Sequence, residues 1–112
     1  MFLVVTRNFP PDVGGIQTLM EGLSLSLAQY SPIKIIADDH KNSEEYDKNS
    51  LLNITRIKGF KLFRKYRKAN YVNNYLNSNK NVKALFVDHW KSLELIKFDK
   101  LKNIKTFCLI HS

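Results

Sequence analysis

Residues 9–16 (Phe-Pro-Pro-Asp-Val-Gly-Gly-Ile) constrain the fold of this 112-residue chain most, because they join an apolar run to an amphipathic segment. The run before them, residues 1–6, is short, apolar and rich in β-branched side chains, which is typical of a buried strand. Over residues 15–30, apolar side chains recur at spacings of three and four, which predicts a helix with one apolar face. The two prolines exclude regular structure in between. The chain therefore opens with a strand, a tight turn and a helix.

Gly14 and Gly15 place a backbone without side chains at the predicted start of this helix. The first N–H groups of a helix are unpaired and carry partial positive charge, so a phosphate group can be received there. The same glycines also suit a tight strand-to-helix turn that binds nothing. A lone Gly-Gly pair does not decide between these two interpretations.

The remaining chain alternates between strand and helix patterns. We expect strands at 33–37, 52–57, 82–87 and 104–110, helices at 62–78 and 91–97, and a polar surface loop at 38–50 with room for a turn of helix near Glu44. This order predicts an α/β fold that is Rossmann-like, with a largely parallel sheet of about five strands flanked by helices. The strand at 52–57 is expected near a sheet edge.

Three candidate site features fall at the carboxyl ends of predicted strands. They are the Gly-Gly turn after the first strand, Asp88 and His89 after the fourth, and His111 after the fifth. In a doubly wound sheet these three strands are neighbours, and ligands bind outside the carboxyl ends of the strands. We therefore expect these residues to converge on one ligand site.

Each candidate also has a structural interpretation. His111 can contact a sugar hydroxyl or a phosphate, or it can simply end its strand as a polar group. Asp88 can serve the ligand or cap the next helix, while Trp90 can pack against the sheet. A zinc site is not expected, since Cys108 points to the opposite face from His111 and a fourth ligand is not evident. Cys108 is expected to be a buried thiol, compatible with a reducing cytoplasm.

Residues 9–16, together with Val-Asp-His-Trp-Lys-Ser at 87–92 and Leu-Ile-His-Ser at 109–112, carry a family resemblance. Because these three motifs occur in this order, the chain resembles the opening part of family-four glycosyltransferases of the GT-B fold. The resemblance implies that Gly14 and Gly15 lie at a cleft against the donor sugar-phosphate and the acceptor, and that His111 contacts substrate. It implies retention of anomeric configuration.

The same resemblance implies that residues 1–112 are a partial N-terminal, acceptor-side domain. Most donor contacts and a Glu-x7-Glu motif would belong to a C-terminal domain that is absent here. The implied function is transfer of a sugar from a nucleotide-sugar donor to a glycan or lipid-linked acceptor. We expect the 112-residue chain alone to be inactive, and we expect neither cofactor nor metal. The implied location is the cytoplasm, at the inner face of the membrane.

The net charge of +8 is concentrated in residues 48–87, which hold ten basic residues and no carboxylate. Within this segment, aromatic side chains are interleaved with the cations Lys61, Arg64, Lys65, Arg67 and Lys68. Such a surface can lie on anionic lipid or, as a weaker expectation, follow nucleic-acid phosphates. Alternatively, the cations form a solvated face and the aromatic rings turn inward to the core.

Two other function classes stay open. One is a non-catalytic module that binds anionic membrane or nucleic acid through the basic segment. The other is a different Rossmann-like nucleotide-binding enzyme in which Asp38, at the end of the second strand, holds a ribose, although a Gly-x-Gly-x-x-Gly motif is missing. The neighbouring pair Asp38 and Asp39 fits either a metal site or an ordinary loop start. No apolar run approaches the roughly 20 residues of a membrane span.

Overall fold

A computed structural model describes residues 1–110 of the chain. The strands are β1 (Phe2–Thr6), β2 (Ile33–Asp38), β3 (Ile54–Ile57), β4 (Ala84–His89) and β5 (Lys105–Ile110). The α-helices are α1 (Gly15–Ala28), α2 (Ser43–Asn49) and α3 (Lys61–Ser78), and two short 3₁₀ segments follow β4, η1 (Trp90–Leu93) and η2 (Phe98–Leu101). His111, one of the candidate site residues, lies outside the described residues.

The five strands form one parallel sheet in the order β3-β2-β1-β4-β5. β1 is central, and its residue Phe2 pairs with Ile33 on one side and with Ala84 on the other. The prediction that the first, fourth and fifth strands are neighbours is confirmed, as is the edge position of β3. The fold is α/β and Rossmann-like, and strand order reverses between β1 and β4.

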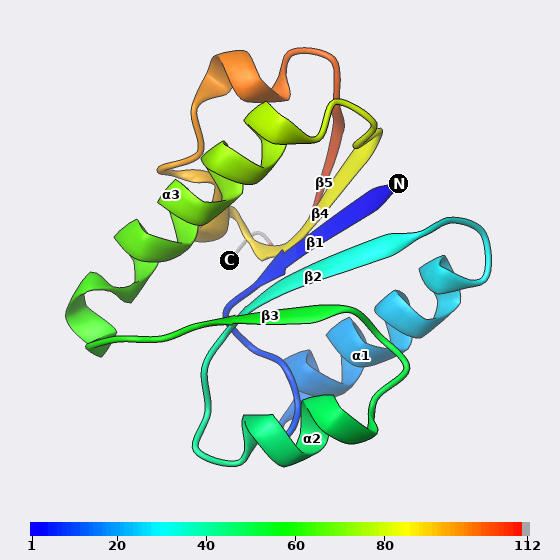
Figure 1. The fold of residues 1–112 in the computed structure, drawn as a ribbon, viewed down its shortest axis with the longest axis vertical. Helices are drawn as coiled ribbons and strands as arrows, with labels where there is room; N and C mark the ends of the chain where they lie inside the picture. The colour runs from blue at the N-terminus through cyan, green and yellow to red at the C-terminus, as the bar shows by residue number, and fades with distance from the viewer. Residues whose placement is uncertain (111–112) are drawn as a thin grey trace.

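Helices cover both faces of the sheet (Figure 1). Alternate residues of β1 point to opposite faces, so Leu3 and Val5 pack toward α3 while Val4 packs toward α1. The α3 face also receives η1 and η2, and the α1 face also receives α2. The strands are apolar on both sides because both faces are covered.

Two local predictions are corrected. The loop expected at 38–50 contains the helix α2, whose acidic first turn and Lys48 in the last turn complement the helix dipole. The α-helix expected at 91–97 is instead the short 3₁₀ segment η1 followed by turns, and η2 begins only at Phe98. Leu93 and Ile96 both pack on the core. Their spacing of three residues is the period of a 3₁₀ turn.

β5 is the second edge of the sheet and is incompletely covered. Phe107 and Leu109 are 45% and 36% exposed, and the Phe107 ring stacks on Phe86 with centroids 4.9 Å apart. Cys108 is half-buried, not buried as predicted, because an edge strand has only one neighbour to cover it. Its thiol donates to the carbonyl of Ile110 at 3.2 Å.

Candidate functional site

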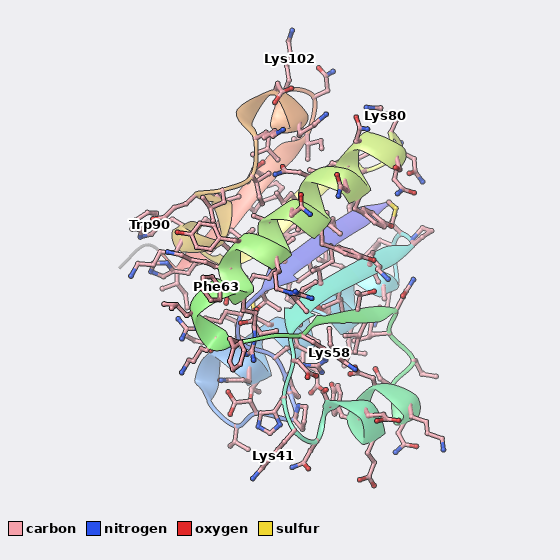
Figure 2. The ribbon with its side chains drawn as sticks, turned by 60° about the vertical axis from the view of Figure 1, so that its left-hand side comes forward. Lys41, Lys58, Phe63, Lys80, Trp90 and Lys102 are labelled. Carbon is pink, nitrogen blue, oxygen red and sulfur yellow. The ribbon has the colours of Figure 1, made fainter. Side chains whose placement is uncertain are left out.

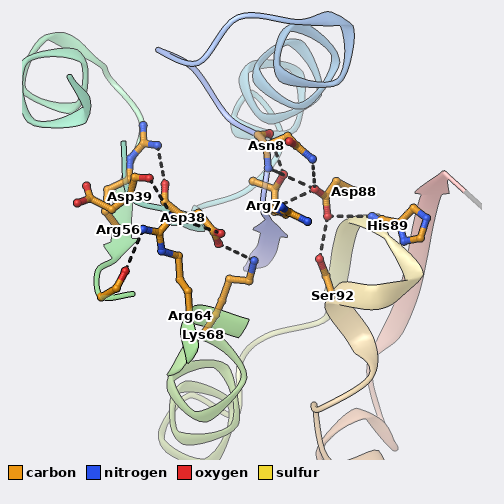
Figure 3. Close-up of polar contacts among 12 residues, drawn as sticks. Arg7, Asn8, Asp38, Asp39, Arg56, Arg64, Lys68, Asp88, His89 and Ser92 are labelled. Carbon is orange, nitrogen blue, oxygen red and sulfur yellow. Dashed lines mark hydrogen bonds and ion pairs between the residues drawn. The ribbon is translucent and has the colours of Figure 1, made fainter. Parts of the chain in front are cut away.

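Asp88 ties the carboxyl end of β4 to the carboxyl end of β1. Its Oδ2 accepts from the backbone N–H groups of Arg7 and Asn8, at 2.9 and 3.3 Å, and from the Asn8 amide at 3.2 Å. Its Oδ1 accepts from the backbone N–H of His89 at 2.8 Å and from the Ser92 hydroxyl at 2.9 Å (Figure 3). The side chain is only 1% exposed. Asp88 therefore positions the loops around the site and does not offer a free carboxylate.

His89 ends β4 and caps η1. Its Nδ1 accepts from the backbone N–H of Lys91 at 3.2 Å, which leaves the ring proton of a neutral imidazole on Nε2. The His89 ring lies 5.6 Å from the Trp90 ring, and Trp90 is 43% exposed instead of packed against the sheet. Both site residues predicted on β4 thus have a local structural role as well as a position at the rim of a cavity.

That cavity lies at the carboxyl ends of β1 and β4 and has a volume of about 420 Å³. Asp88 and His89 line it together with Arg7 from the β1 end and residues of α3 and η1. Its place beside the reversal of strand order is where ligands bind in open α/β sheets. Of the residues predicted to converge on one site, the structure thus brings Asp88 and His89 to this cavity, together with the end of β1.

The Gly-Gly turn lies beside this cavity but does not line it. Ile16, the next residue, contributes to the lining, whereas Gly14 and Gly15 do not. In the described part of the chain, no side chain caps the start of α1. A Cβ at Gly15 would meet no heavy atom within 4 Å, whereas one at Gly14 would come within 2.3 Å of Gln17 Oε1. The space in front of Gly15 is thus open to a ligand.

The sequence did not reveal the residue that fixes the turn before the glycines. Arg56 of β3 donates to the Pro10 carbonyl at 2.6 Å and to Asp47 of α2 at 2.8 and 3.0 Å. Its guanidinium lies 5.7 Å from the centre of the Phe9 ring and its side chain is 5% exposed. We call these contacts of Arg56 with Pro10, Asp47 and Phe9 the Arg56 clasp. The signal for it in the sequence was a charged residue within the otherwise apolar alternation of β3.

Tyr46 of α2 completes this clasp. Its ring packs edge-on against Phe9 and lies 5.9 Å from the Arg56 guanidinium. Burial raises the pKa of Tyr46 above its usual range, and its hydrogen bond to the Glu21 carboxylate raises it further. The hydroxyl consequently remains a proton donor to Glu21 of α1, which joins α1 to α2 next to the turn.

Asp38, at the carboxyl end of β2, is engaged by cations of α3. Lys68 Nζ lies 2.6 Å from its Oδ1 and Arg64 Nη1 lies 3.9 Å from its Oδ2 (Figure 3). The neighbouring Asp39 accepts from the Ser43 hydroxyl at 2.7 Å, and this bond lowers the pKa of Asp39. Among residues 1–110, no three His, Cys, Asp or Glu side chains are grouped to hold a metal ion.

The predicted basic segment divides into two environments. Lys68 is 6% exposed and Arg64 is half-buried, so the Asp38 ion pairs withdraw them from the surface. The basic–aromatic surface at the start of α3 consists of exposed side chains only: Phe60, Lys61, Leu62, Phe63, Lys65, Tyr66 and Arg67. Phe60, Leu62 and Phe63 are 84%, 75% and 57% exposed, so the aromatic rings do not turn inward (Figure 2).

Comparison with known proteins adds no family or neighbour. No family model, curated protein or solved structure matches this chain. Within the described residues, no helix combines the length and the hydrophobicity needed to cross a membrane.

Proposed function

We propose that this chain is the acceptor-side domain of a glycosyltransferase that transfers a sugar from a nucleotide-sugar donor to a glycan or lipid-linked acceptor. The observation that carries the proposal is the open, uncapped start of α1 at Gly15, directly beside the cavity at the β1 and β4 ends. A donor phosphate would meet the N–H groups of this helix start, while an acceptor would occupy the cavity.

A donor-binding domain in the same polypeptide is the partner that this proposal requires. The reading frame beyond the codon for Ser112 tests it. A second Rossmann-like pattern that contains Glu-x7-Glu supports the proposal. A stop codon directly after Ser112, or turnover of a nucleotide sugar by the 112-residue chain alone, contradicts it.

Gly15→Ala provides the test on the chain itself. The methyl group meets no neighbouring atom, so the fold should be retained, but it would occupy the space that a donor phosphate approaches. We expect about tenfold weaker binding of UDP-glucose or GDP-mannose, equivalent to about 1.4 kcal/mol. The measurement is an NMR titration that follows the backbone amides of Gly15 and Ile16.

Gly22→Ala is the matched control, because it makes the same change in the same helix and also meets no atom within 4 Å. It should leave binding unchanged while raising the free energy of unfolding by up to about 1 kcal/mol. Equal nucleotide-sugar affinities in the two variants would argue against a donor phosphate at the helix start.

The alternative of a dinucleotide-binding enzyme is less favoured by the geometry. In that reading Asp38 would bind ribose hydroxyls, yet its carboxylate already accepts from Lys68 at 2.6 Å and faces Arg64. A ribose would have to compete with a partly buried ion pair.

A specific observation favours a second role, docking of the basic–aromatic surface on an anionic membrane. Exposed aromatic and leucine side chains among exposed cations fit the boundary between lipid headgroups and acyl chains. This role is compatible with a lipid-linked acceptor at the inner face of the membrane. It does not depend on catalysis.

Vesicle sedimentation tests the docking role. Lys61→Gln should weaken binding to vesicles of equal parts phosphatidylcholine and phosphatidylglycerol about fivefold, since one basic residue contributes about 1 kcal/mol near such a surface. Leu62→Ser should weaken it as well, whereas Leu51→Ser, at a fully exposed leucine outside α3, should not. Docking through this surface is excluded if Leu51→Ser and Leu62→Ser behave alike, or if pure phosphatidylcholine binds equally well.

A further inference from the structure

We propose that the cavity between β1, β4 and α3 binds the phosphate group of a phosphorylated sugar. That this ligand is the acceptor rests on the proposed function, whereas the binding itself follows from the residues that line the cavity. The Gly-Gly turn is a separate place, since neither glycine lines the cavity.

Three cations from three different segments meet around this cavity. Arg7 follows β1, Lys65 belongs to α3 and Lys91 belongs to η1, and all three side chains are exposed. Within residues 1–110, no hydrogen bond or ion pair engages the charged end of any of them. The charged group of Lys65 lies 5.2 Å from the centre of the Tyr66 ring. The cavity therefore has donors that remain available to an anion.

The other charged groups at the cavity are already satisfied or too few to neutralise these cations. Lys68 is paired with Asp38, and Asp88 accepts five hydrogen bonds from the surrounding loops. Glu94 is the remaining carboxylate of the lining. Apart from Lys68, which Asp38 neutralises, the lining holds three cations and two carboxylates, an excess of one positive charge. A phosphate ester carries about −1.5 to −2 at neutral pH, so the excess has the sign that attracts it.

The rest of the cavity is suited to the uncharged part of such a ligand. Val5, Ile16 and Val72 give it an apolar side, and Ser92 and Asn8, whose side chains both donate to Asp88, add polar groups to its lining. A volume of about 420 Å³ falls within the range of small-molecule sites. Cations together with a lining of apolar and polar side chains fit a sugar phosphate better than a bare inorganic ion.

An NMR titration of the 112-residue chain with glucose 1-phosphate, at constant ionic strength, tests this inference. The backbone amides of Asn8, Lys65 and Lys91 should shift, and methyl glucoside, which lacks the phosphate, should leave them unmoved. Arg7→Gln and Lys65→Gln should each weaken binding about tenfold. Arg7 donates to Asp88 through its backbone, so its substitution keeps that contact. Lys102→Gln, an exposed cation outside the cavity, should bind as the parent chain does.

Equal binding of methyl glucoside, or unchanged affinity in Arg7→Gln and Lys65→Gln, would overturn the inference. Shifts confined to the Gly15 amide, which lies outside the cavity lining, would also overturn it, while leaving the proposed donor site intact. Conversely, phosphate binding that depends on Arg7 would uphold the cavity assignment even if the reading frame failed to show a donor domain. The two proposals therefore fail independently.

Discussion

Arg56→Met should lower the free energy of unfolding by about 3 kcal/mol, because it breaks a buried ion pair and leaves its partner charged. Arg56 is 5% exposed, and its loss removes the donors to Asp47, to the Asp38 carbonyl and to the Pro10 carbonyl. Methionine retains apolar contact with Phe9, so the loss reports chiefly on the polar contacts. Urea unfolding followed by circular dichroism gives the measurement.

Arg67→Met is the matched control, since Arg67 is exposed on α3. The same chemical change there should alter stability by no more than about 0.5 kcal/mol. A loss below about 1 kcal/mol for Arg56→Met would mean that the clasp contributes little beyond an ordinary surface ion pair. The turn at residues 9–16 would then need another explanation for its fixed conformation.

Asp88→Asn should cost about 3 kcal/mol, although it changes neither the size nor the shape of the side chain. Oδ2 of Asp88 accepts three hydrogen bonds and Oδ1 accepts two. Whichever way the new amide faces, its NH₂ group meets donors, so at least two N–H or O–H groups lose their acceptor. Each buried unsatisfied group costs about 1–3 kcal/mol. The same urea unfolding experiment measures this loss.

Asp99→Asn is the control for that substitution, because Asp99 is exposed on η2. Its free energy of unfolding should stay within about 0.5 kcal/mol of the parent value. If Asp88→Asn were equally mild, Asp88 would not be the group that holds the β1 and β4 ends together. The prediction also separates stability from binding, since both variants keep the cations of the cavity.

Strand positions could be predicted from the sequence because apolar runs and turn residues mark them locally. The same runs predicted that β1, β4 and β5 are neighbours and that β3 lies at an edge, since a parallel α/β order allows few topologies. The position of Asp88 and His89 at the end of β4 followed from where the apolar run stops. Each of these features can be recognised within a short segment of the sequence.

Contacts between distant segments could not be predicted in the same way. Lys68 was assigned to the surface with its basic neighbours, yet it pairs with Asp38, thirty residues earlier. Helical spacing held a partial signal, since Lys68 lies four residues before the buried Val72 and therefore on the same face of α3. Arg56 likewise finds its partners on α2 and in the proline turn, and local pattern does not specify those partners.

The central position of β1 has a consequence for the order in which the molecule can assemble. β1 is made first, and its partner β2 follows after one helix, so this pair can form early during synthesis. Its other edge pairs with β4, which emerges only after β2, α2, β3 and α3 have been made. Until then, the backbone groups on the β4 side of β1 have no partner, which favours aggregation. We therefore expect closure of the sheet centre at β1 and β4, which also creates the cavity, to be a late, long-range step of folding.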